Sequence, residues 1–268
     1  MGILSATPFG MTEGVVSALP KRRRTQLQNW SCIASVVLWV FFLLPQMGHL
    51  ASRYEFIQSL QFCAFAFVVP VLLVVGAPWR VFGSKPSPQH VSNGRRAVAF
   101  FFDIFVEKTE GRAGVGGRNR ALALAAIYVA MDIFWRTASM VDLLARRPVL
   151  DGAEAVSFLI IGAAVFSELV ESPPTRPKVG RVQRFVTAAV VMWTTWIMAY
   201  LQGMSGHSWY GVFRNVVGRR LSMANDQQLA TFSIWLIAAA VFLPIIFGNI
   251  IHWLQDQSRL DAENIVLG

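Results

Sequence analysis

Six segments dominated by apolar residues alternate with polar connections along the chain, although none of them is uniformly apolar. Each holds enough residues to cross the hydrocarbon core of a bilayer, which takes about 20 residues in a helix. The pattern therefore predicts an all-α polytopic helical membrane bundle with six spans. They are expected at about residues 30–50, 56–79, 121–141, 152–170, 185–204 and 229–254.

The longest connection, residues 80–120, lies between the second and third predicted spans. It begins with the Pro/Ser-rich GSKPSPQ and ends with the Gly/Arg-rich GRAGVGGRNR, both flexible or irregular by composition. Residues 97–106 are apolar but too few to span, and they suit a helix lying at the cytoplasmic interface. A seventh, strongly tilted span is the alternative. The predicted organisation is a basic N-tail (1–28), a membrane domain (29–255) and a C-tail (256–268).

Composition and charge agree with a membrane protein. Of 268 residues, 54% are hydrophobic and 15% charged, which would expose too much apolar surface in a soluble domain. The net charge of +9 is accompanied by no basic helix or base-stacking motif, so we expect no nucleic-acid partner. Cytoplasmic loops retain Lys and Arg during insertion. Placing both termini in the cytoplasm puts 17 of these residues inside and 6 outside, which predicts that orientation.

Polar side chains within the predicted spans are candidate functional groups, because a charge at membrane depth is costly unless it is paired or faces water. Asp132 and Arg136 lie one helical turn apart on the third span, an acid and a base on one face. Gln58, Gln61 and Glu154 lie near the outer ends of their spans, and we expect them to meet Arg136 in one cluster. We also expect Glu154, Asp132 or both to neutralise Arg136. The cluster either holds helices together or binds a partner.

A second polar group lies at the mouth of the sixth span. The block DQQLATFSIW places an acid and two amides, Asp226, Gln227 and Gln228, directly before an apolar run. We include these three residues in the candidate polar cluster.

Metal-ligating and catalytic residues are scarce in the spans. His252 is the one histidine within a predicted span, close to its cytoplasmic end. Thioethers suit monovalent copper, but Met192 and Met198 are six residues apart and do not share a helix face. Cys32 and Cys63 lie in apolar segments, where free cysteine behaves as a small hydrophobe. No catalytic triad or phosphate loop is present, so we do not expect an enzyme.

Three sequence blocks carry a resemblance to a known family. In the second span, QSLQFCAFAFVVPVLLVVGAP is similar to an H-x-x-Q-H block followed by an apolar helix, a proline and G-A-P. In the fourth, DGAEAVSFLIIG is similar to H-x-x-E-H-x-x-F-x-x-x-G, and DQQLATFSIW reproduces a D-Q-Q block with its tryptophan. Over about residues 50–255 the chain thus resembles the CtaG-type cytochrome c oxidase assembly factors, bacterial membrane proteins implicated in copper insertion. The agreeing residues in the first two blocks are Gln61, Pro70, Gly76, Ala77, Pro78, Glu154, Phe158 and Gly162.

The departures from this family fall on its histidines. Where the family has paired histidines four residues apart, this chain has Gln58 and Phe62, then Asp151 and Ala155. Arg136 replaces a further histidine. A guanidinium cannot bind a cation and its fixed charge repels one. The resemblance therefore implies the fold and a bacterial cytoplasmic (inner) membrane location more strongly than copper ligation.

Three functions follow from this resemblance. The first is an accessory or assembly protein for a haem-copper terminal oxidase, working in the lipid bilayer through contacts with oxidase subunits or other assembly factors. The second is a copper carrier that uses substitute ligands such as Cys32, Cys63 and methionines. The third is a membrane-complex subunit or small-molecule transporter that reuses the fold. We expect no bound cofactor, with copper as the alternative.

Overall fold

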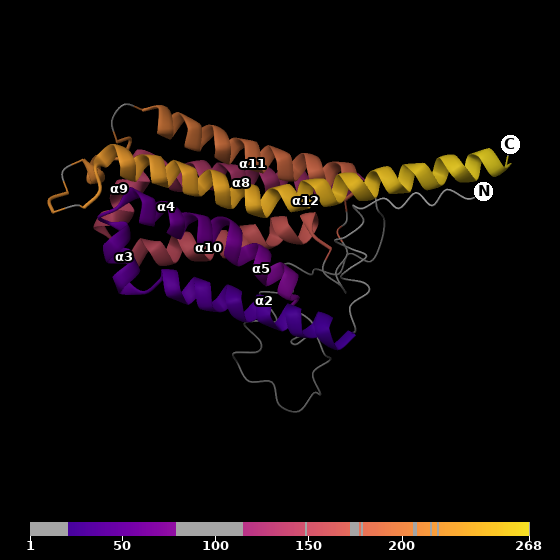
Figure 1. Ribbon diagram of the computed structural model, residues 1–268, viewed down its shortest axis with the longest axis horizontal. Helices are drawn as coiled ribbons and strands as arrows, with labels where there is room; N and C mark the ends of the chain where they lie inside the picture. The colour runs from indigo at the N-terminus through magenta and orange to yellow at the C-terminus, as the bar shows by residue number, and fades with distance from the viewer. Residues whose placement is uncertain are drawn as a thin grey trace, which may run out of the picture.

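The computed structural model describes residues 21–78, 115–147, 149–171, 177, 179–205, 208–214, 216–218 and 220–267, and these are arranged as a helical bundle without strands (Figure 1). The helices in chain order are α2 (Lys21–Phe42), α3 (Pro45–Ala51), α4 (Glu55–Cys63), the π-helix η1 (Ala64–Val68), α5 (Val69–Gly76), α8 (Val115–Trp135), α9 (Ala138–Arg146), α10 (Val149–Leu169), α11 (Arg181–Met204), the 3₁₀ helix η2 (Gly211–Phe213) and α12 (Met223–Leu267).

The helices suit a multi-pass membrane protein, as the apolar pattern predicts. Four segments are long and apolar enough to cross a membrane: Glu55–Gly76, Val149–Leu169, Arg181–Met204 and Met223–Ala262. The first and third predicted spans are instead bent pairs, and counting each pair as one span gives six. The described helices thus allow four to six spans. Residues 97–106, with most of the 80–120 connection, lie outside the described residues.

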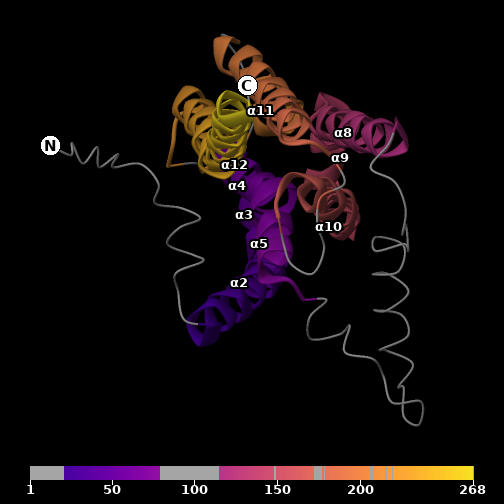
Figure 2. The same cartoon turned by 90° about the vertical axis from the view of Figure 1, so that its right-hand side faces the viewer.

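The continuous segment formed by α4, η1 and α5 is the centre of the bundle. It packs against α2, α10 and α12 (Figure 2). In its most apolar part 67% of the residues are buried, against 33–39% in the other three spans. Its aromatic side chains build the core: Phe62 meets Phe158 edge to face, and Phe67 meets Phe242. Side chains in the second predicted span are therefore the ones best shielded from lipid.

Two sharp bends divide helices at the end of the bundle where α3 and α9 lie (Figure 1). Each bend is 63°. Pro45 opens α3, where its missing N–H costs nothing, so α2 ends before it at Phe42. After Trp135 the chain leaves the helix, and the Thr137 hydroxyl donates to the Phe134 carbonyl at 2.9 Å. The apolar pattern predicts one span at 30–50 and one at 121–141, and the structure has a bent helix pair in both places.

The proline of the second span explains a contact in the core. Pro70 has no N–H to donate to the Ala66 carbonyl four residues earlier, within the π-helix. The hydroxyl of the fully buried Tyr128 donates to that carbonyl instead, at 2.7 Å. A side chain replaces the missing backbone donor, as a membrane interior requires. A Cβ at Gly162 would lie 2.8 Å from Pro70 Cγ, so α10 packs closely against this proline.

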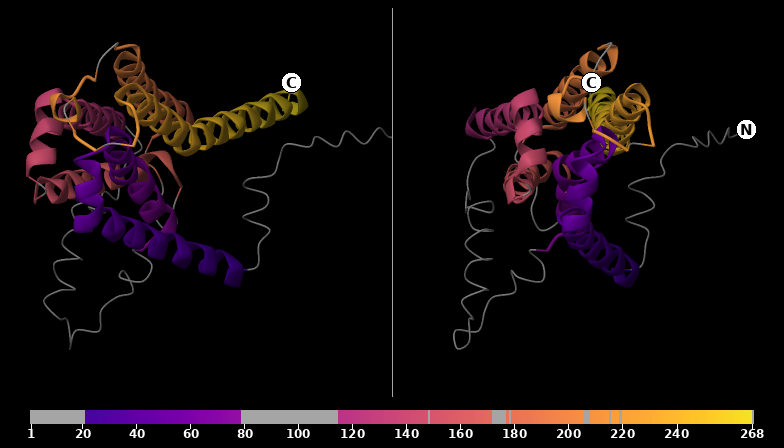
Figure 3. Two further views of the ribbon diagram at one scale, coloured as in Figure 1. Left: turned by 60° about the vertical axis from the view of Figure 1, so that its left-hand side comes forward. Right: turned by 90° about the vertical axis from the view of Figure 1, so that its left-hand side faces the viewer.

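Helix α12 is the longest element and extends beyond the other helices (Figure 3). It is bent, and Pro244 lies inside it, where proline interrupts the helical hydrogen bonds. The end of α12 and the start of α2 lie at the same end of the bundle (Figure 1). We call this the terminal end, and the opposite end, with α3 and α9, the bend end.

Candidate functional site

A small cavity at the bend end gathers three of the predicted site residues. Gln58, Gln61 and Glu154 line it together with Asp151, and its volume is about 10 Å³. This is room for about one water molecule. The remaining lining residues come from α3, α9 and the turn after α3: Gly48, Ala51, Ser52, Leu144 and Ala145. Side chains of the second and fourth predicted spans thus meet at this end of the bundle.

The polar side chains that line this cavity differ in whether they have hydrogen-bond partners. Gln61 is buried, and its amide donates to the Phe42 carbonyl at 3.0 Å, which ties α4 to the end of α2. Glu154 is only 2% exposed, and its Oε1 has no hydrogen-bond partner among the described residues. An unpaired buried carboxylate oxygen is costly and therefore marks a candidate site. Asp151 and Gln58 are half-buried at the cavity wall.

Arg136 does not join this cavity. Its guanidinium lies over the Phe62 ring, 5.2 Å from the centroid, and its Nη2 donates to Gln202 Oε1 of α11. No ion pair or hydrogen bond joins it to the carboxylates of Asp132 or Glu154 within the described residues, and its Nη1 has no partner there. The predicted neutralisation by direct pairing is therefore wrong. The backbone is not the reason, because the Arg136 N–H still donates to the Asp132 carbonyl at 3.3 Å, and the two residues remain one helical turn apart. The Arg136 side chain instead turns to Gln202 of α11.

Gln202 bridges Arg136 to an acid that the sequence did not single out. Its amide nitrogen donates to Glu55 Oε1, and Ser208 donates to Glu55 Oε2 at 3.2 Å. All four side chains are buried. Glu55 lies one residue before the second predicted span and reads as a loop residue, so sequence position gave no signal for its burial. The available sign of this contact was Gln202 itself, a polar residue close to the end of an apolar span that needs a hydrogen-bond partner.

Asp132 belongs to a separate contact deeper in the bundle. The Thr195 hydroxyl of α11 donates to Asp132 Oδ2 at 2.9 Å, while Oδ1 has no hydrogen-bond partner among the described residues. Both residues are buried. The carboxyl group thus links α8 to α11, and it lies apart from the cavity lined by Glu154.

The three residues of the DQQ block have three different environments. Asp226, fully buried, accepts the backbone N–H groups of Glu55 at 2.9 Å and Phe56 at 3.1 Å. It therefore caps the N-terminus of α4 from a different helix, where negative charge is favourable. Gln227 is also buried, and its amide donates to the Gln202 carbonyl near the end of α11. Gln228 is exposed.

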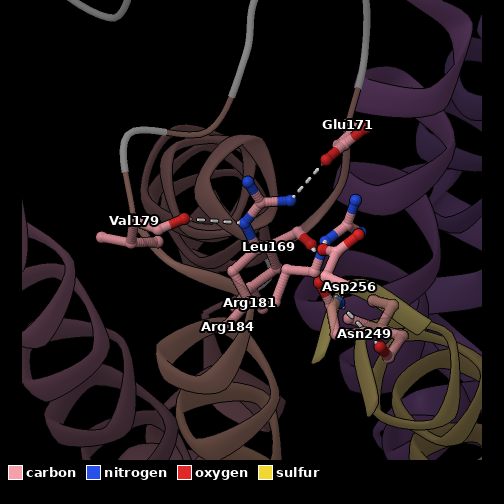
Figure 4. A network of polar contacts seen from close by, with 8 residues as sticks. Leu169, Glu171, Val179, Arg181, Arg184, Asn249 and Asp256 are labelled. Atoms are coloured by element: carbon pink, nitrogen blue, oxygen red, sulfur yellow. Dashed lines mark hydrogen bonds and ion pairs between the residues drawn. The ribbon is translucent and has the colours of Figure 1, made fainter. Parts of the chain in front are cut away.

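The terminal end holds a second polar network, which the sequence did not predict (Figure 4). The buried Arg184 donates from Nη1 to Glu171 Oε1 at 2.8 Å and from Nε to the Val179 carbonyl at 3.0 Å. Arg181 pairs with Asp256 at 2.9 Å. Glu171 lies outside the spans, and the hydrogen bond from Arg184 lowers its pKa below the ordinary value of 4.5.

A sequence model of the cytochrome c oxidase caa3 assembly factors matches residues 15–256, which is most of the chain. The chain belongs to this family. No curated protein and no solved structure matches it. The family match thus associates the helical bundle with the assembly of cytochrome c oxidase.

Copper is the cargo that the resemblance implies for this assembly factor, and the side chains at the bend end do not match its preferred ligands. Monovalent copper prefers thiolate, thioether and imidazole ligands, whereas the bend-end cavity offers two carboxyl groups and two amides. Phe62 and Ala155, at two former histidine positions, are buried in the apolar core instead. In the part of the chain that the structure describes, no group of three or more His, Cys, Asp or Glu residues is placed to hold a metal ion. The donor set does not fit copper.

The cysteines do not supply a joint substitute site. A Cβ at Gly76 would lie 2.8 Å from the Cys32 backbone nitrogen, so Cys32 lies beside the end of α5. Cys63 precedes Gly76 by 13 residues in the same continuous helical segment. At 1.5 Å per residue this is a separation of about 20 Å along the axis. One copper ion cannot bind both thiols.

Proposed function

We propose that this protein is an integral membrane accessory protein in the assembly of a haem-copper terminal oxidase. It acts in the bacterial cytoplasmic membrane through contacts with oxidase subunits or other assembly factors, and it does not carry copper at the histidine positions of the family. The observation that carries the proposal is the chemistry of the former ligand positions: Gln58, Phe62, Arg136, Asp151 and Ala155 offer no imidazole.

The contact between Arg136 and Phe62 supports this view physically. A cation–π contact is favourable for the guanidinium and places a fixed positive charge next to the former ligand position. A copper ion brought to this place would be repelled by that charge and would find an aromatic ring in place of one imidazole. Arg136 and Phe62 thus pack against each other where the resemblance implies copper ligands. This favours a protein that keeps the family's fold and contacts its partners through another surface.

The residues able to reach a partner are the exposed members of the polar set. Gln61, Asp226 and Gln227 are buried and hydrogen-bonded within the chain, so they hold helices together. Gln228 is exposed and Gln58 is half-buried, both near the bend end. We propose that the bend end is the face that meets the oxidase subunit or assembly factor.

A gentle-detergent purification of the full chain tests the proposal. Oxidase subunits or assembly factors are expected by mass spectrometry, with copper far below one ion per chain by elemental analysis. Gln228→Ala should lower the co-purified partner without lowering the yield of folded protein, and Gln61→Ala, its buried counterpart, should lower the yield itself. Near-stoichiometric copper that disappears with Gln58→Ala or Glu154→Ala contradicts the proposal. Copper that disappears only with Cys63→Ser or Met198→Leu favours the carrier.

The orientation that we propose puts both termini in the cytoplasm. Two exposed positions suit cysteine labelling: Val217, 89% exposed near the bend end, and Leu260, 53% exposed on α12. In intact cells a membrane-impermeant thiol reagent should label Val217→Cys and leave Leu260→Cys unlabelled until the cells are opened. The reverse pattern would show that the orientation is inverted.

A further inference from the structure

A groove of about 390 Å³ lies at the terminal end between α5, the end of α10, the start of α11 and α12. Its character changes along α12, from apolar side chains around Val241 and Ile245 to polar ones at Asn249 and His252. The seven-residue step from Ile245 to His252 is about 10 Å along a helix. The groove is thus apolar at membrane depth and polar where α11 begins. Its lining residues are Val71, Val75, Leu169, Val170, Glu171, Arg181, Arg184, Ala240, Val241, Pro244, Ile245, Gly248, Asn249 and His252.

The polar part of the groove retains unused hydrogen-bond donors. Arg184 uses Nε and Nη1 for Val179 and Glu171, and its Nη2 makes no hydrogen bond with the described residues. Arg181 uses Nε for Asp256, and neither of its terminal nitrogens makes a hydrogen bond within the same residues. Both arginines lie in the first turn of α11 and line the groove (Figure 4). The two ion pairs fix the orientation of the arginines, and three of their nitrogens make no hydrogen bond with the part of the chain that the structure describes.

We propose that this groove is a specific binding site for an anionic phospholipid. The phosphate binds Arg181 and Arg184, whose planar guanidinium groups match phosphate oxygens. An acyl chain lies along the apolar wall of α5 and α12. Glu171 and Asp256 balance the charges of the two arginines, so the preference for a phosphate comes from the guanidinium N–H groups that make no hydrogen bond within the described residues. Basic pockets between spans on the cytoplasmic side bind anionic lipid headgroups in this way.

The apolar length of the groove is the reason for choosing a lipid over a soluble anion. A free phosphate ion would use the arginines and leave the wall formed by Val71, Val75 and Val241 uncovered. A diacyl lipid covers both parts. The inference is independent of the oxidase role, because it rests on this groove at the opposite end of the bundle from the cavity with Glu154.

Gly248 provides a variant that blocks the groove without disturbing the fold. It lines the groove, and a Cβ built on it has no atom within 4 Å. Gly248→Leu therefore places a side chain in open space, and leucine favours the helix over glycine. Gly152 is the matched control, because it is also helical and also has nothing within 4 Å, but it lies outside the groove.

The test is native mass spectrometry of the full chain after incubation with equal amounts of phosphatidylglycerol and phosphatidylcholine. The wild-type protein and Gly152→Leu should retain phosphatidylglycerol preferentially, and Gly248→Leu should bind it about tenfold more weakly, which is about 1.4 kcal/mol. Arg181→Gln should abolish the preference for phosphatidylglycerol while some lipid is still retained.

Three results would overturn the proposal. Equal retention by Gly248→Leu and Gly152→Leu would place the lipid elsewhere on the protein surface. Equal retention of the two lipids by the wild-type protein would remove the headgroup recognition. Displacement of the lipid by inorganic phosphate, with the same thermal stabilisation by phosphate alone, would identify a free anion as the ligand.

Discussion

Replacement of Asp226 by alanine separates a structural from a functional role of the DQQ block. The carboxylate is fully buried and accepts two backbone N–H groups at the start of α4, at 2.9 and 3.1 Å. Alanine leaves both donors without an acceptor, and each buried unsatisfied group costs about 1–3 kcal/mol. Loss of the negative charge at a helix N-terminus adds up to about 1 kcal/mol. We expect Asp226→Ala to lower the free energy of unfolding by about 2–7 kcal/mol.

Two further variants make this prediction specific. Asp226→Asn keeps one acceptor oxygen and should cost about half as much. Gln228→Ala changes the exposed neighbour in the same block and should stay within about 0.5 kcal/mol of the wild-type protein. Unfolding in mixed micelles with a denaturing detergent, followed by tryptophan fluorescence, measures all three. Asp226→Ala with wild-type stability but without oxidase assembly would refute the capping argument and make Asp226 a recognition residue.

Four other substitutions test the packing, the bridge and the ion pair. Gly162→Ala should lower the free energy of unfolding by about 1–3 kcal/mol because its Cβ would meet the rigid Pro70 ring at 2.8 Å, whereas Gly248→Ala, in open space, should raise it by up to about 1 kcal/mol. Equal effects in the same unfolding assay would contradict this packing. Gln202→Leu should cost about 3 kcal/mol because it leaves the guanidinium and carboxylate that it bridges without their amide partner, and an unchanged unfolding midpoint would show that the bridge is dispensable. Glu171→Gln should lower the free energy of unfolding at neutral pH. Because the pKa of Glu171 lies below 4.5 in the folded protein, the difference from wild type should vanish as the pH falls through that folded value. A difference that persists in acid would rule out the ion pair as its cause.

The membrane architecture could be predicted because it depends on apolar length, which is a property of the sequence. The all-helical bundle and the meeting of Gln58, Gln61 and Glu154 at one end follow from length and depth. The bends were not predicted, although Pro45 marks the first one. Apolar residues continue on both sides of each break, so hydropathy alone cannot distinguish a straight span from a bent pair.

The partner of Arg136 could not be predicted because depth in the membrane does not give the direction of a side chain. Glu154 lies at a suitable depth, yet the guanidinium points to Gln202 of α11, 66 residues later in the chain. Its burial against Phe62 also depends on where α8 ends. The buried Glu55 was missed for a related reason: its environment is created by Gln202, Ser208 and the cap from α12, all distant in sequence.

The structure also explains how the family scaffold can persist without the family's histidines. Asp226 and Gln227 bind backbone groups of α4 and α11, so their role does not depend on a metal. Gln61 in the second span likewise binds a backbone carbonyl at the end of α2. Backbone partners remain when nearby side chains change, whereas ligand positions such as Phe62 are free to become part of the aromatic core. The helix contacts of these blocks therefore depend on backbone partners and not on histidine, so the blocks identify the fold whether or not the protein handles copper.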